Sequence, residues 1–115
     1  MIKRLHPGKR FCEAVIVNGI ITTAGITGRD ESADTTAQTK DILAQIDALL
    51  AETGSSKARL ISANIWLRDI AHFDQMNAVW DSWIDPANLP VRATVEARLA
   101  APELLVEIQV TALAG

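Results

Sequence analysis

Several features are missing from this 115-residue chain, and each absence excludes a class of protein. A single cysteine cannot form an internal disulfide, so we expect a free thiol in a reducing compartment. No apolar run approaches the roughly 18 residues of a membrane span. Residues 1–10 carry charges with no apolar stretch behind them, which argues against a signal peptide. Together, these absences predict a cytoplasmic protein with no membrane partner.

Basic charge, metal-ligand spacings and nucleophile motifs are also scarce. Eleven Lys and Arg residues against fourteen Asp and Glu residues give a net charge of −3, so no nucleic-acid partner is expected. The two histidines lie far apart, and neither belongs to a spacing that is typical of a metal site, so no metal is expected. Cys12 has no neighbour in sequence that would activate it, and no serine lies in a G-x-S-x-G motif.

β-strands are predicted at the start of the chain. Two β-type runs, 14–17 and 20–23, flank Asn18-Gly19, the pair best suited to the positive φ angles of a two-residue type I′ turn. This pattern predicts a hairpin. A further short strand is expected at about 2–5, with Pro7-Gly8 as its turn.

A first helix follows the polar segment 27–36, which is typical of a surface loop. Asp34 or Thr35 is expected to cap this helix, and Gln38 would complete a capping box with Thr35. Apolar residues at helical spacing continue towards Gly54, whose left-handed conformation would end the helix.

Strands and a second helix are predicted in the rest of the chain. Residues 60–67 read as a central strand, because both of its faces carry large apolar side chains. Asp69 is expected to cap a helix that ends near Pro86. Segments 91–99 and 104–112 alternate between apolar and polar residues, and the short loop between them predicts a second hairpin. The whole chain is therefore interpreted as one α+β domain, a mixed sheet with two helices on one face.

The last two segments would gather their polar side chains on one sheet face while their apolar side chains meet the helices. The polar members are Arg92, Thr94, Glu96, Glu107 and Gln109. In a hairpin Glu96 would lie opposite Glu107, and the two carboxylates would repel each other unless an arginine or a partner chain compensated. This face is either exposed to water, as in many antiparallel sheets, or an oligomer interface that Leu60, Trp66 and Leu105 make partly apolar.

Four stretches, spread over nearly the whole chain, match one known pattern. They are residues 90–99 (PVRATVEARL) followed by 106–108, residues 69–80, residues 21–25 and residues 38–54. The first resembles the C-terminal signature of the RidA (YjgF) family. The second and fourth resemble the two helices of that family, and the third resembles its strand that ends in a small residue and glycine. The likeness is greatest to the short YoaB-like members.

The resemblance implies a chorismate-mutase-like α+β fold and a homotrimer whose sheets pack towards its centre, with three clefts between subunits. Family members with the signature arginine hydrolyse reactive imines and enamines, such as 2-aminoacrylate, to 2-keto acids and ammonia, and they need no cofactor. These intermediates leave pyridoxal-phosphate enzymes. The resemblance thus implies an imine/enamine deaminase of the 2-iminobutanoate/2-iminopropanoate type.

The family's functional residues can be carried over position by position. Arg92 would bind the substrate carboxylate, a role that suits the bidentate geometry of guanidinium, and Glu107 would position the attacking water. Gly25 would let the backbone approach the ligand, and Asn77 would lie near the cleft. The competing structural readings are a surface ion pair for Arg92 and a solvated side chain for Glu107. The competing reading of Gly25 is a strand end that needs no Cβ atom. The competing reading of Asn77 is a helix-surface or capping amide.

Three expected cleft residues depart from the family pattern. Phe11 stands in place of a tyrosine, so the ring is kept and the hydroxyl is lost. Thr94 replaces a cysteine or serine, and Ala24 replaces a common serine. An alternative function is therefore a non-catalytic protein that binds or senses a keto acid or another small carboxylate. RNA cleavage, reported for some family members, is a third alternative, against which the acidic charge balance argues.

Overall fold

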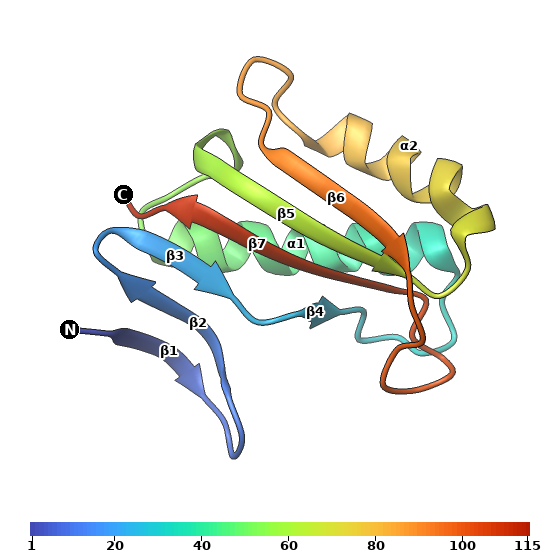
Figure 1. Ribbon diagram of the computed structural model, residues 1–115, viewed down its shortest axis with the longest axis horizontal. Helices are drawn as coiled ribbons and strands as arrows, with labels where there is room; N and C mark the ends of the chain where they lie inside the picture. Colours follow the sequence, from blue (N-terminus) through green and yellow to red (C-terminus); the bar gives the residue numbers. More distant parts are fainter.

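The computed structural model describes residues 1–115 and contains one seven-stranded mixed sheet and two α-helices (Figure 1). The strands are β1 (Lys3–Pro7), β2 (Cys12–Val17), β3 (Ile20–Thr23), β4 (Ile26–Thr27), β5 (Leu60–Leu67), β6 (Val91–Glu96) and β7 (Val106–Leu113). The helices are α1 (Thr35–Glu52) and α2 (Phe73–Trp83), with short 3-10 turns η1 (Lys57–Arg59) and η2 (Ile70–His72). The order across the sheet is β1-β2-β3-β7-β5-β6, and β4 pairs with β7.

Both helices cover one face of the sheet, which confirms the expected α+β architecture. α1 runs behind the central strands, and α2 lies along the β6 edge (Figure 1). Fully buried side chains of α1, such as Ile42 and Ile46, pack with Ile65 of β5 and Ile108 of β7 in a single hydrophobic core. Neither helix combines the length and the apolar character that crossing a membrane requires.

The hairpin of β2 and β3 is confirmed, and its turn has the expected geometry. Asn18 and Gly19 have φ angles of 50° and 76°, as a type I′ turn requires. The first strand lies later than expected, and Pro7-Gly8 is not its turn: β1 runs to Pro7, which pairs with Cys12, so the turn begins only at Gly8. The N–H of Gly8 donates a 2.8 Å hydrogen bond to the Phe11 carbonyl and closes this turn.

Helix α1 begins and ends as expected, but its capping differs in one respect. The Asp34 carboxylate accepts a 2.8 Å hydrogen bond from the Ala37 N–H and caps the helix. Gly54, with φ 73°, follows its last turn. The expected capping box is wrong, because the Gln38 side chain is buried and bonds to groups of other segments.

The expected hairpin of the last two strands is also wrong, because β5 lies between β6 and β7. β6 runs parallel to β5, and β7 runs antiparallel to it, with Glu107 opposite Trp66. Glu96 is therefore not paired with Glu107, and its carboxylate accepts a 3.0 Å hydrogen bond from the Ile70 N–H. A strand with two apolar faces favours neighbours on both edges, and alternation within β6 or β7 does not specify which strand is next to it.

The faces of β6 are reversed relative to the expectation. Val91 and Val95 are 71% and 50% exposed, so the apolar side of this edge strand points away from the helices. Arg92 and Thr94 point towards α2, where the Arg92 guanidinium lies over the Trp80 ring. An arginine has a long apolar stem that packs well under a helix, so alternation alone mispredicts the inward face.

Candidate functional site

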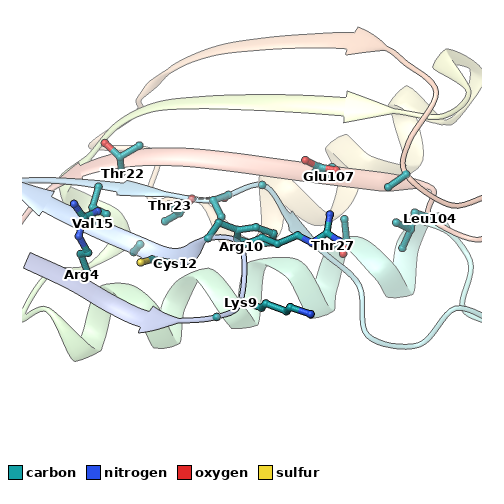
Figure 2. A pocket seen from close by; sticks show the side chains of 16 residues that line it. Arg4, Lys9, Arg10, Cys12, Val15, Thr22, Thr23, Thr27, Leu104 and Glu107 are labelled. Atoms are coloured by element: carbon teal, nitrogen blue, oxygen red, sulfur yellow. Dashed lines mark hydrogen bonds between the residues drawn. The ribbon is translucent and has the colours of Figure 1, made fainter.

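A hollow of about 820 Å³ lies between the β1–β2 turn, the break between β3 and β4, and the start of β7 (Figure 2). Four of the seven predicted site residues line it, namely Phe11, Ala24, Gly25 and Glu107. The hollow is large enough for a metabolite, since small-molecule sites span about 300–1,000 Å³. It is therefore the candidate binding site of this chain.

Glu107 supplies the acidic group of the hollow. Its neighbours Val106 and Ile108 are fully buried in the core, so strand alternation turns Glu107 to the opposite sheet face. The half-buried carboxylate belongs to neither of the chain's ion pairs. It is thus available to a ligand or to a water molecule.

Gly25 creates the space that the Glu107 carboxylate occupies. A Cβ atom at position 25 would overlap this carboxylate and would lie only 2.8 Å from Glu107 Cδ. The same segment is held in register by β4, where Thr27 pairs with Glu107. The need for glycine here is therefore a need for room beside one particular side chain.

Phe11 and Ala24 form apolar parts of the wall. Phe11 ends the β1–β2 turn with 70% of its surface exposed, and the Ala24 N–H donates a 2.8 Å hydrogen bond to the Glu13 carbonyl. Cys12 lines the hollow as a half-buried free thiol. Neither Phe11 nor Ala24 offers a hydroxyl, so the polar chemistry of the hollow comes from other lining residues, among them Glu107.

The other three predicted residues, Arg92, Thr94 and Asn77, lie outside the hollow. They form a second group of side chains, between β6 and α2. The Arg92 guanidinium carbon is 5.2 Å from the Trp80 ring centre and 5.8 Å from that of Phe73. Burial lowers the pKa of Arg92, and the negative charge of Asp81 opposes this shift. Asn77 is half-buried, four residues after Phe73 and three before Trp80, so helical spacing puts it on this side of α2.

Thr94 is the unusual member of this second group. Its Oγ1 atom is buried and has no hydrogen-bond partner in the chain. A buried hydroxyl without a partner costs about 1–3 kcal/mol, so such groups normally contact a ligand, a water or another chain.

The two groups do not meet within one chain, contrary to the expectation of a single polar face. Arg92 and Thr94 lie on the helix side of the sheet, whereas Glu107 lies on its open side. The strand partners explain the difference: with β5 inserted, β6 and β7 are not neighbours, and their polar faces are not the same face. The described residues also form no group of three or more His, Cys, Asp or Glu side chains that could hold a metal.

Sequence reasoning missed three residues that line the hollow and a fourth, Gln38, that supports its wall. Arg4, Lys9 and Arg10 line it, and the Lys9-Arg10 pair beside Phe11 was the signal that could have identified them. Gln38 was interpreted only as a capping residue.

The structure shows Gln38 joining two loops from its place in α1. Its amide donates hydrogen bonds to the carbonyls of Ala33 (3.0 Å) and Glu103 (2.9 Å) and accepts one from the Leu105 N–H (2.9 Å). Because Leu104 lines the hollow, Gln38 supports its wall from behind.

Comparison with known proteins agrees with this architecture. The family described as Endoribonuclease L-PSP matches residues 1–114. A RutC family protein of Haemophilus ducreyi is 44% identical over 112 residues, which cover 97% of this chain and 96% of that protein. The RutC family protein YoaB of Escherichia coli is 39% identical over 111 residues, 96% of each chain.

Solved structures and one named enzyme extend the comparison. A YjgF family protein of Neisseria meningitidis superposes with a TM-score of 0.95 at 46% identity, covering 100% of this chain and 96% of that one. The 3-aminoacrylate deaminase RutC of Acinetobacter baylyi is 30% identical over 104 residues, 85% of this chain and 82% of the enzyme.

The mixed sheet with two helices on one face, and the hollow at its open side, define a RidA-type α+β protein. The chain belongs to the RidA (YjgF) family. The sequence resemblance to the YoaB-like members is confirmed by the match to YoaB itself.

Proposed function

We propose that this single-domain chain forms a homotrimer and hydrolyses 2-imino acids, or the enamines in equilibrium with them, in a cleft between two subunits. Water adds to the imine carbon, the carbon–nitrogen bond breaks, and one 2-keto acid and one ammonia leave for each water consumed. The 3-aminoacrylate deaminase among the relatives supports this chemical class, since its name states removal of ammonia from an enamine acid. We propose a cytoplasmic location, where the imines released by pyridoxal-phosphate enzymes arise.

The observation that carries the proposal is the division of the site into two incomplete halves. Glu107 and Gly25 line the hollow, while Arg92 and the unpartnered hydroxyl of Thr94 lie across the sheet by α2. A neighbouring subunit that sets its β6 edge against the hollow would bring a carboxylate anchor to an acidic group. The exposed Val91 and Val95 of that edge support such packing, because apolar side chains gain from being covered.

Each residue then has a role that its chemistry allows. Arg92 binds the substrate carboxylate through two parallel hydrogen bonds, and the Thr94 hydroxyl donates to the same end of the substrate. Glu107 accepts a hydrogen bond from the attacking water and takes its proton as the water adds. Gly25 keeps that carboxylate in place, and Asn77 lies beside the anchor.

Orientation supplies most of the rate in this proposal. Free imines already hydrolyse in water, so the main task of the protein is to hold the imine carbon and the water at reacting distance. The Phe11 ring and Ala24 contribute an apolar wall that limits the competing water around the substrate.

The test is imine turnover by wild type and by Arg92→Ala. An amino-acid oxidase generates the imine, and keto-acid release is followed with a trapping reagent. We expect Arg92→Ala to lose at least about a hundredfold in kcat/KM, because a charged bidentate contact is removed. Arg98→Ala is the matched control, since Arg98 follows β6 outside both groups and is exposed. Light scattering should give three times the chain mass of 12.4 kDa for all three proteins.

Turnover that persists in Arg92→Ala would contradict the role of Arg92 as the carboxylate anchor. A monomer at micromolar concentration would contradict the intersubunit cleft.

A second candidate function is non-catalytic binding of a keto acid or another small carboxylate. The absence of hydroxyls at Phe11 and Ala24 favours it, because a proton relay through those positions is lost. Keto-acid binding to wild type without any imine turnover would identify this second function.

A further inference from the structure

Three cationic side chains line the hollow, and the proposed hydrolysis uses none of them. Arg4 comes from β1, and Lys9 and Arg10 come from the turn that follows it. Figure 2 shows Arg10 reaching across the hollow towards Thr27. Glu107 is the one acidic residue of the lining, so the hollow carries an excess of positive charge.

These cations are not neutralised within the chain. The two ion pairs join His6 to Glu52 and Arg29 to Asp41, and neither includes a residue of the hollow. The chain as a whole has a net charge of −3, so this local positive charge runs against the overall balance. A concave site lined by one sign of charge concentrates ligands of the opposite sign.

We propose that the hollow binds a second anionic group of the substrate, so that the preferred substrates are dicarboxylic 2-imino acids. This inference rests on the proposed function. Arg92 of a neighbouring subunit takes the carboxylate next to the imine, and Arg10 with Lys9 takes the carboxylate at the far end. A guanidinium and an ammonium suit a carboxylate well, and a monocarboxylic substrate would leave both cations facing water.

The shape of the hollow favours a small dianion over a nucleic acid. Its volume of about 820 Å³ is that of a metabolite site. Single-stranded RNA needs a basic groove that follows several phosphates and a series of aromatic stacking partners. Here the cations are confined to one hollow, whose lining contains one aromatic residue, Phe11.

The experiment compares keto acids as product analogues, using the trimer and isothermal titration calorimetry. The pairs are 2-oxoglutarate with 2-oxopentanoate and oxaloacetate with 2-oxobutanoate. Each pair is measured with wild type, Arg10→Gln and Lys9→Gln. Lys40→Gln is the matched control, because Lys40 is an exposed α1 residue outside the hollow that carries the same charge. Turnover of monocarboxylic imines is measured in parallel.

We expect wild type to bind the dicarboxylate at least about tenfold more tightly than its monocarboxylic partner, as two partly exposed cations allow. Arg10→Gln and Lys9→Gln should each reduce this preference by roughly fivefold, while Lys40→Gln leaves it unchanged. Raising the ionic strength from about 0.05 M to 0.5 M should weaken dicarboxylate binding more than monocarboxylate binding.

Other outcomes overturn the inference. Equal binding within each pair, or equal loss for both ligands in Arg10→Gln, would show that the cations select nothing, while turnover of monocarboxylic imines would leave the proposed function standing. Binding of a fluorescent RNA hexamer that Arg10→Gln weakens and Lys40→Gln does not, together with no dicarboxylate binding, would assign the hollow to RNA. Absence of both keto-acid binding and imine turnover would refute the proposed function and this inference together.

Discussion

One added methyl group at Gly25 tests the role of Glu107 without a substitution at position 107. A Cβ atom at position 25 would lie 2.8 Å from Cδ and 3.2 Å from Cγ of Glu107, and it would overlap the carboxylate. Carbon atoms in contact normally stay about 3.5–4.0 Å apart, so the carboxylate must move by about 1 Å. The change in Gly25→Ala is therefore a displacement of the acidic group.

The effects on stability and on activity should separate. The positive-φ glycines are Gly19 and Gly54, so alanine fits the backbone at position 25 and restricts the unfolded chain, a gain of about 0.4–1 kcal/mol. Turning the Glu107 side chain to a new position costs about 0.5–1.5 kcal/mol. The free energy of unfolding should thus change by less than about 1 kcal/mol. Imine turnover should fall by about a hundredfold, because a misplacement of 1 Å has that effect on reacting groups.

Urea unfolding and imine turnover, measured on the same samples, check this prediction. Gly28→Ala is the comparison, since its Cβ would lie 3.1–3.3 Å from Gln38 atoms and no Glu107 atom is among them. That variant should lose stability rather than turnover. The double variant Gly25→Ala with Glu107→Ala should turn over no more slowly than Glu107→Ala alone. Wild-type turnover by Gly25→Ala would refute the reasoning that the position of the Glu107 carboxylate matters.

Two further predictions concern stability. Gln38→Ala removes three hydrogen bonds of a buried amide, so the free energy of unfolding should fall by about 2–4 kcal/mol in urea titration, and a loss below 1 kcal/mol would mean that the loops do not depend on it. The hydrogen bond and the charge of Glu52 raise the pKa of His6 above its ordinary value of 6.5, so the pair stabilises the fold fully below pH 6.5 and less as pH rises through the raised pKa. His6→Gln should therefore lower the urea midpoint at pH 6 relative to wild type and leave it unchanged at pH 9. An equal difference at both values would rule out the protonated pair.

The elements that could be predicted from the sequence are those with local causes. Asn18-Gly19 prescribes its turn because both residues accept positive φ, and Gly54 ends α1 for the same reason. Asp34 caps α1 through a bond to a residue three positions away. The residue types of the site were also evident, since Arg92 and Glu107 lie in a segment that resembles a family signature.

The neighbours and faces of the strands could not be predicted in this way. Alternation has a period of two, so it separates the side chains of β6 into two sets without saying which set faces α2. Arg92 takes the inward position because the rings of Trp80 and Phe73 cover it there. The hydrogen bonds of Gln38 likewise join segments more than 60 residues apart, and no local pattern announces them.

The sequence by itself determined the Asn18-Gly19 turn, the ends of α1 and the inventory of reactive side chains. The turn and the helix ends depend on φ preferences or on hydrogen bonds within a few residues. The tertiary structure alone decided that β5 separates β6 from β7, that Arg92 and Glu107 lie on opposite faces, and that Arg4, Lys9 and Arg10 share a hollow with Glu107. Those outcomes depend on how all the apolar surface of the chain is buried at once, which is a property of the whole fold and of no single segment.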